Sequence, residues 1–201
     1  MTVSPRVSLI VSSHNRPLAL RLLLTSLQLQ TELSWETIVT DNSDKENAYV
    51  IQLEIERVDD PRIRYIYTGD RAANCYCSAD MAVPQAKGEW LGFPSDDGYY
   101  CPWYLERMLR CAQQHGPSTA LVYCNVVLGS AAAHPALDTH PRCCEIDKTT
   151  FLVRRDWFER VGGFGAENVG LPAPSDGLFI EKLIAQGIDH AKVGELLCVH
   201  N

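Results

Sequence analysis

Hydrophobic and polar residues along this chain follow two alternating patterns. Short runs rich in valine, isoleucine and leucine are typical of buried strands, and apolar residues three or four positions apart are typical of helices. The first strand is expected at residues 7–12, and Pro17 opens a helix with four leucines on one face. Further strands are expected at residues 36–40, 63–67, 90–93, 120–127, 146–153 and 192–199. Further helices are expected at residues 49–56, 77–85, 102–115, 156–161 and 176–186.

This order of elements predicts an α/β domain in which helices flank a mostly parallel central sheet. The length of 201 residues suits one domain, and the sequence contains neither an internal repeat nor a low-complexity linker. Residues 129–144 are rich in small residues and contain two prolines, which is typical of a loop. We therefore expect a single domain over residues 1–201.

Polar clusters follow three of the predicted strands. They are His14-Asn15-Arg16, Asp41-Asn42-Ser43 and Ser95-Asp96-Asp97. In open α/β sheets, ligands bind beyond the carboxyl ends of the strands. The three clusters therefore predict a binding site at one edge of the sheet.

The charge of the chain limits the partners that such a site can take. With 25 Asp and Glu against 18 Lys and Arg, the formal charge is −7, and no basic cluster indicates a nucleic-acid partner. An acidic protein can still hold a diphosphate when a divalent cation lies between the negative groups. The glycine patterns of phosphate loops and dinucleotide-binding turns are absent from the sequence. Asp96 and Asp97 are therefore candidate ligands for Mg²⁺ or Mn²⁺, and a solvated turn is the alternative.

The sequence contains no run of about 20 apolar residues and no signal-peptide pattern, so we expect a cytoplasmic protein without a transmembrane segment. Peripheral contact with a membrane stays open. Eight cysteines are present without a Cys-x-x-Cys pair, and we expect reduced thiols. A soft-metal site is the alternative, built from the Cys75/Cys77 and Cys143/Cys144 pairs with His140.

Several segments in order resemble the family 2 glycosyltransferases, the inverting group with the GT-A fold. Residues 7–17 resemble the first strand of that family and its Asn-Arg-Pro turn, and residues 35–44 resemble its second strand with an Asp-rich end. Residues 86–97 resemble the stretch that carries the metal-binding aspartates. Residues 151–164 and 176–183 resemble the acceptor-side half. The resemblance covers nearly the whole chain.

This resemblance implies that residues 1–100 bind a nucleotide sugar and that residues 101–201 face the acceptor. It places Ser12, His14, Asn15, Arg16, Asp41, Ser95 and Asp96 at the nucleotide. Within that set, Asp41 would accept a hydrogen bond from the base, and Asp96 would lie near the ribose and the metal.

The same resemblance implies a metal site and a catalytic base. Asp97 would ligate Mn²⁺ or Mg²⁺, with Asp96 nearby, and His200 matches a histidine that some relatives add to the metal shell. Asp176 matches the aspartate that removes the proton from the acceptor hydroxyl, and helix capping is its alternative role.

The implied reaction is an inverting single displacement from a nucleoside-diphosphate sugar, with a UDP-sugar as the family-level expectation, of hexosyltransferase type. The implied acceptor is a glycan, a lipid-linked molecule or a small molecule, in bacterial polysaccharide biosynthesis. The chain departs from the family pattern at Ala79-Asp80, where many relatives carry an Arg-Asn pair, so a positive charge expected near the diphosphate is lost. Ser175 replaces the usual acidic residue before the catalytic aspartate. These departures keep a second interpretation open: a degenerate GT-A-like module that binds a nucleotide sugar or a protein without turnover. A nucleotidyltransferase of the same fold is disfavoured, because residues 12–15 lack its glycine-rich loop.

Overall fold

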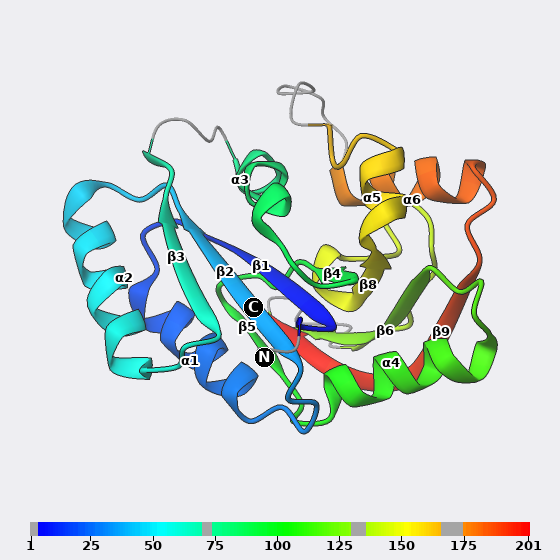
Figure 1. Ribbon diagram of the computed structural model, residues 1–201, viewed down its shortest axis with the longest axis horizontal. Coiled ribbons are helices and arrows are strands. Elements are labelled where there is room, and N and C mark those ends of the chain that lie inside the picture. The colour runs from blue at the N-terminus through cyan, green and yellow to red at the C-terminus, as the bar shows by residue number, and fades with distance from the viewer. Residues whose placement is uncertain (1–3, 70–73, 130–135, 166–174) are drawn as a thin grey trace.

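A nine-stranded sheet runs through the molecule, and helices cover both of its faces (Figure 1). The computed structural model describes residues 4–69, 74–129, 136–165 and 175–201. The strands are β1 Val7–Ser13, β2 Trp35–Asp41, β3 Ile63–Tyr67, β4 Trp90–Gly92, β5 Gly98–Tyr100, β6 Leu121–Leu128, β7 Ala136–Leu137, β8 Phe151–Arg154 and β9 His190–His200. The helices are α1 Pro17–Gln28, α2 Lys45–Val58, α3 Cys75–Ala82, α4 Tyr104–His115, α5 Arg155–Arg160 and α6 Ser175–Ala185. Two 3₁₀ turns, η2 Val83–Gln85 and η3 Lys148–Thr150, complete the set.

The sheet has the strand order β3-β2-β1-β4-β8-β6-β9-β5, and β7 pairs with β6 outside this path. The first four strands in this order are parallel, as are β6 and β9, whereas β8, β5 and β7 pair antiparallel to their neighbours. Ser13 pairs with Asp41, and an isolated bridge joins Ser12 to Ser95. The carboxyl ends of β1 and β2 therefore meet the loop after β4 at one edge, as the sequence predicts.

Two hydrophobic cores lie on the two faces of this sheet. Val7, Leu9 and Val11 of β1 belong to a core with residues of α1, α2 and α4, whereas Ile10 belongs to a second core with residues of α3, α5 and α6. This alternation follows from the two-residue period of a strand. In Figure 1, α3, α5 and α6 lie above the sheet and α1 and α4 lie below it.

Caps shift several element boundaries from the predicted ones. Asp44 accepts a hydrogen bond from the Asn47 amide at 2.9 Å, so α2 begins at Lys45 and not at residue 49. Asn74 accepts bonds from the amides of Tyr76 and Cys77 at 3.0 and 2.9 Å, so α3 begins two residues earlier than predicted.

The predicted strand over residues 146–153 is wrong in its first half. Asp147 accepts hydrogen bonds from the amide and hydroxyl of Thr149, at 2.8 and 2.7 Å, and these bonds close the 3₁₀ turn η3 before β8 begins at Phe151. The short strand β5 and the two-residue strand β7 were not predicted. β7 lies in the predicted loop 129–144, of which residues 130–135 fall outside the described residues.

At the other end of the strands, where β1 and β4 begin, the backbone of Gly88 lies very close to the backbone of Ser8. A Cβ atom on Gly88 would lie 2.5 Å from the backbone nitrogen of Ser8, and the Gly88 amide donates to the Ser8 hydroxyl at 2.8 Å. The buried carboxylate of Glu36 accepts bonds from Ser8 Oγ at 2.7 Å, from the Lys87 amide at 2.6 Å and from Arg64 at 2.9 Å. These contacts join the beginnings of β1, β2 and β4.

Candidate functional site

Asp96 is held at the carboxyl end of β1. Its Oδ2 atom accepts hydrogen bonds from Ser13 Oγ at 3.1 Å and from the His14 amide at 3.3 Å. Burial raises the pKa of Asp96, and the negative charge of Asp97 adds to this, while the Ser13, His14 and Arg16 contacts oppose it. Two of the three predicted polar clusters therefore meet directly at this carboxylate.

Asp97 lies beside Asp96, and its two carboxylate oxygens have different surroundings. Its Oδ2 atom pairs with Arg16 Nη1 at 2.5 Å, and the same guanidinium lies 3.4 Å from Asp96 Oδ1. Its Oδ1 atom is buried and accepts no hydrogen bond from the described residues. The backbone carbonyl of Asp97 accepts a bond from the Asn201 side chain at 2.9 Å.

His200 brings the last strand to the same place. Its Nε2 atom lies 3.7 Å from Asp97 Oδ1, and its Nδ1 atom lies 2.9 Å from Asp147 Oδ2. The hydrogen bond with Asp147 raises the pKa of His200. Burial alone would raise the pKa of Asp147, but the contacts with His200 and Thr149 lower it to about 2. A carboxylate on Nδ1 leaves Nε2 as the ring nitrogen that faces Asp97.

Asp176 stands at the first turn of α6, next to this cluster. Its Oδ2 atom accepts a hydrogen bond from the Lys148 amide at 3.0 Å, and its Oδ1 atom accepts one from the Gly177 amide at 2.9 Å. Burial raises the pKa of Asp176, and the nearby charge of Asp147 adds to the effect. A buried carboxylate with a raised pKa has the properties of a general base or acid.

The predicted nucleotide residues lie along the same edge. The Ser12 hydroxyl donates to the Cys75 carbonyl at 2.8 Å, and the Asn15 amide donates to the Ser43 hydroxyl at 2.7 Å. The Asp41 side chain is fully buried, and its two oxygens accept bonds from Tyr65 Oη at 2.7 Å and from the Ser43 amide at 2.8 Å. Because this side chain is fully buried, a base can bond to Asp41 only after neighbouring side chains move to expose it.

Two residues of the site were missed from the sequence: Asp147 and Lys148. They join the two parts of the cluster, since Asp147 contacts His200 and the Lys148 amide contacts Asp176. The Lys148 ammonium lies 3.5 Å from the carbonyl of Phe93, at the end of β4. An Asp two residues before a threonine, as in Asp147-Lys148-Thr149, is a capping signal that could have identified this turn.

The departures at Ala79 and Asp80 have structural roles. Ala79 is buried in the core beneath α3. Asp80 Oδ1 accepts a hydrogen bond from the Phe164 amide at 3.0 Å. A Cβ atom on Gly163 would lie only 2.5 Å from the same oxygen, so a side chain at that position would overlap it. Gly163 also has a φ of +64°, which favours glycine. Asp80 therefore fixes the turn after α5. The side chain of Ser175 lies outside the described residues.

The Asp97 region fits a hard divalent cation. A buried carboxylate oxygen that accepts no hydrogen bond from the described part of the chain faces an imidazole nitrogen held by a second carboxylate. Oxygen and imidazole donors suit Mn²⁺, and a diphosphate and water commonly complete its shell. Asp97 and His200 are the side chains that could ligate such a cation. Among the described residues, no group of three or more His, Cys, Asp or Glu side chains could hold a metal.

The eight cysteines form no disulfide bond in the described structure. No helix within the described ranges is both long and apolar enough to span a bilayer.

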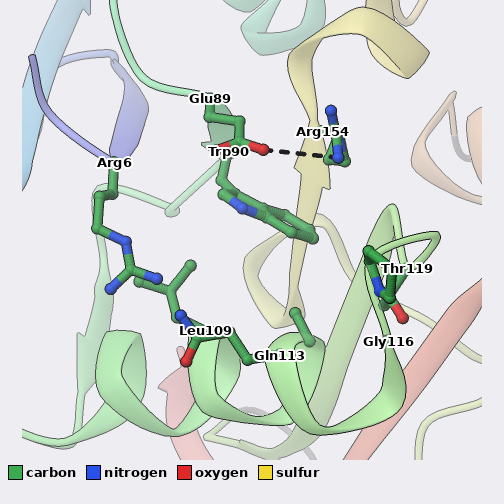
Figure 2. Close-up of a pocket in the computed structure, with 10 residues that line it drawn as sticks. Arg6, Glu89, Trp90, Leu109, Gln113, Gly116, Thr119 and Arg154 are labelled. Carbon is green, nitrogen blue, oxygen red and sulfur yellow. Dashed lines mark ion pairs between the residues drawn. The ribbon is translucent and has the colours of Figure 1, made fainter.

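A hollow of about 390 Å³ lies at the opposite end of the strands (Figure 2). The Trp90 ring projects into it, with Arg6 on one side and Arg154 on the other, and Arg154 pairs with Glu89 at 3.6 Å. Its lining contains none of the predicted site residues.

Comparisons with known proteins agree with this architecture. The family model described as Glycosyl transferase family 2 matches residues 8–162. Protein CgeD of Bacillus subtilis (strain 168) is 31% identical over 124 residues, which are 59% of this chain and 28% of that protein. The putative glycosyltransferase EpsH of the same organism is 30% identical over 122 residues, which are 61% of this chain and 34% of that protein. The chain thus spans about a third of the length of these curated relatives.

Solved structures share the fold at low sequence identity. Residues 1–349 of S. aureus TarS superpose with a TM-score of 0.79 at 16% identity, covering 98% of this chain and 60% of that chain. The mannosyltransferase PcManGT from Pyrobaculum calidifontis, in complex with GDP-Man and Mn²⁺, has a TM-score of 0.75 at 19% identity, covering 99% of this chain and 57% of that chain. TarS has also been solved with UDP and with UDP-GlcNAc. The predicted α/β fold of GT-A type is confirmed.

Proposed function

The chain belongs to glycosyl transferase family 2, and from this premise we propose that it transfers a sugar from a nucleoside-diphosphate donor to an acceptor hydroxyl. The observation that carries the proposal is the series of contacts that runs from Asp97 through His200 and Asp147 to the Lys148 amide and Asp176. In the proposal, Asp97 and His200 form a cation site and Asp176 is the buried base beside it. The donor class is supported by relatives of the same fold solved with UDP, UDP-GlcNAc or GDP-Man.

Asp97 and His200 hold a divalent cation in this proposal, and Asp96 supports them. The bound cation would offset the negative charge that develops on the departing diphosphate. Arg16 neutralises the adjacent aspartates, since its guanidinium contacts both of them. Asp147 orients the His200 ring through Nδ1, as carboxylates commonly do for metal-binding histidines.

Asp176 accepts the proton of the acceptor hydroxyl. Its two oxygens are oriented by the backbone amides of Lys148 and Gly177, so the carboxylate cannot rotate freely. Burial raises its pKa, which brings the base closer to working pH. Attack by the activated hydroxyl on the face opposite the diphosphate inverts the anomeric centre in a single displacement.

In this proposal Lys148 supplies the positive charge that the family pattern carries in α3, where this chain has Ala79 and Asp80. Its ammonium lies at the carboxyl end of β4, 3.5 Å from the Phe93 carbonyl, within the acidic cluster of Asp147 and Asp176. In this role it contacts the leaving diphosphate directly. The departures in α3 are then compatible with turnover.

The competing function is a module that binds a nucleotide sugar without turnover. It is favoured by the structural roles of Ala79 and Asp80 and by the internal hydrogen bonds of Asp41. The retained Asp176 geometry favours the enzyme.

Calorimetric titration with UDP and GDP, each with Mn²⁺ and then with a chelator, tests the proposal. We expect binding of one nucleotide that depends on the metal in the wild-type protein and is lost in Asp97→Asn. Asp156→Asn, an exposed change on α5, is the matched control and should bind normally. Metal-independent binding, or equal binding by Asp97→Asn, would remove the cation site from the proposal. Absence of binding by the folded wild type would reject the nucleoside-diphosphate donor.

A further inference from the structure

Cys143 and Cys144 are neighbours in the chain whose sulfur atoms lie 3.7 Å apart. Cys144 is exposed and Cys143 is half-buried, whereas Cys124 and Cys198 are buried. A disulfide bond needs the two sulfurs at about 2.05 Å, so closing this gap takes rotation of both side chains and a strained adjustment of the backbone. The exposed Cys144 gives a reagent access to the pair.

The backbone around the pair forms a tight turn. The His140 amide donates to the Glu145 carbonyl at 2.8 Å, and the Arg142 guanidinium pairs with Glu145 at 2.7 Å. Cys144 has a φ of +65°, a left-handed conformation that residues with a side chain seldom adopt. The turn thus holds both thiols at its tip and keeps the backbone of Cys144 in a conformation that cysteine seldom adopts.

The same turn packs against the first turn of α6. The Cys143 amide donates to Glu181 Oε1 at 3.3 Å, and a Cβ atom on Gly177 would lie 2.7 Å from Cys143 Sγ. Gly177 follows Asp176 in the chain and donates its amide to that carboxylate. Cys143 therefore lies against Gly177, the residue next to the proposed base Asp176.

We propose that Cys143 and Cys144 form a vicinal dithiol that a disulfide oxidant converts reversibly to a Cys143–Cys144 disulfide. The thiolate of one cysteine attacks a sulfur of the oxidant and releases one thiol, which leaves a mixed disulfide. The second thiolate attacks that mixed disulfide at the protein sulfur and releases the second thiol. Two electrons and two protons pass to the oxidant, which leaves as two thiols.

Adjacency makes this disulfide easy to reduce. Consecutive Cα atoms are about 3.8 Å apart across a trans peptide, which is shorter than the range of about 4.4–6.8 Å found in most disulfides. The closed ring is therefore strained, and strained, exposed disulfides are the labile ones. The product suits a reversible modification.

Closure of the ring changes the contact with α6. Cys143 Sγ fills the space beside Gly177, and rotation toward Cys144 withdraws it from that space. The amide of Gly177 then loses packing on one side, and its hydrogen bond to Asp176 opens more readily. The redox state of the pair is thereby transmitted to the first turn of α6.

Oxidised glutathione added to the reduced full chain tests the site, with intact-mass and peptide mass spectrometry as the readout. Wild type should lose two hydrogens, about 2 Da, with a link inside one peptide between residues 143 and 144, and dithiothreitol should reverse the loss. Cys144→Ser should instead retain glutathione on Cys143, because the second thiol is missing. Cys111→Ser, at a half-buried thiol of α4, should behave as wild type. A link between any other pair of cysteines, or no loss of hydrogens, would overturn the proposal.

Hydrogen exchange of the peptide that contains residues 175–185 tests the transmission and needs neither donor nor acceptor. Oxidised wild type should exchange faster there than reduced wild type. A variant with both Cys143→Ser and Cys144→Ser, which has neither thiol, should show no difference between oxidant-treated and untreated samples. Equal exchange in the two states of the wild type would overturn the link to Asp176.

Discussion

The Nδ1 atom of His200 lies 2.9 Å from Oδ2 of Asp147, a contact between residues 53 positions apart. It joins the end of β9 to the turn that precedes β8, and it directs the opposite ring nitrogen toward Asp97. Because β9 pairs with both β5 and β6, the histidine is fixed by backbone bonds on two sides. The candidate cation site is therefore assembled from three segments that are remote in the sequence.

Replacement of Asp176 by Asn should abolish sugar transfer and leave donor binding intact. The amide side chain retains the size of the carboxylate but cannot accept the proton of the acceptor hydroxyl, and loss of a general base costs about 100-fold or more in rate. Calorimetry measures donor binding, and nucleotide release from the identified donor measures turnover. A normal rate of release by Asp176→Asn would refute the base role. Asp156→Asn is the control for a lost carboxylate elsewhere.

Replacement of Lys148 by Ala should weaken nucleoside-diphosphate binding by about one to two orders of magnitude, since a charge-assisted contact contributes about 1.5–3 kcal/mol. The backbone amide that orients Asp176 is kept in this variant. Lys148→Arg keeps the charge and should retain most of the affinity, while Lys192→Ala removes a lysine that pairs with Asp138 away from the site. Equal affinity of Lys148→Ala and wild type would assign Lys148 a role in the turn alone.

Replacement of Gly88 by Ala should lower the free energy of unfolding by about 2 kcal/mol, because the new methyl group overlaps the backbone of Ser8. Chemical denaturation measures the loss. Gly194→Ala is the matched control, since no atom lies within 4 Å of its added Cβ, and it should change stability by less than about 0.5 kcal/mol. Similar free energies of unfolding for the two variants would show that the backbone around Gly88 and Ser8 moves apart to accommodate the methyl group.

Replacement of Glu36 by Gln should make stability depend less on pH. Burial opposes ionisation of Glu36, but the bonds from Ser8, Lys87 and Arg64 prevail and lower its pKa below the usual 4.5. Its contribution is therefore complete above the unfolded-state pKa and is lost as the pH falls through the lower folded-state pKa. At pH 7 the variant should be less stable by about 2 kcal/mol, and the difference should narrow in acid.

Denaturation curves between pH 7 and pH 3 check this prediction. Glu89→Gln is the control, because Glu89 is exposed and its ion pair with Arg154 is worth little. If the difference in the free energy of unfolding between Glu36→Gln and wild type stays constant with pH, the hydrogen-bond geometry, and not the ionised carboxylate, supplies the stability.

The sequence predicted the fold well where the hydrophobic period is regular. The strands at β1, β2, β3 and β4 and the edge at which they end follow from local patterns, so the meeting of Arg16 with Asp96 and Asp97 could be anticipated. The short strand β5 could not, because its three residues gain their strand geometry by pairing with β9.

The roles of Asp147 and Asp80 escaped prediction for a different reason. Asp147 follows Ile146 in a segment that we expected to form a strand, and only the return of β9 beside it brings His200 to its carboxylate. Asp80 was interpreted as a lost charge near the ligand, whereas its carboxylate caps a turn 84 positions later in the chain. Both contacts depend on long-range packing that local patterns do not contain.

The bond from the Asn201 side chain to the Asp97 carbonyl has a practical consequence. Any residues joined after Asn201 leave the sheet beside the proposed cation ligand, whereas Arg6 enters at the other end of β1. A purification tag at the carboxyl end would crowd Asp97 and could make an active protein test as inert. A tag before residue 4 avoids that edge of the sheet.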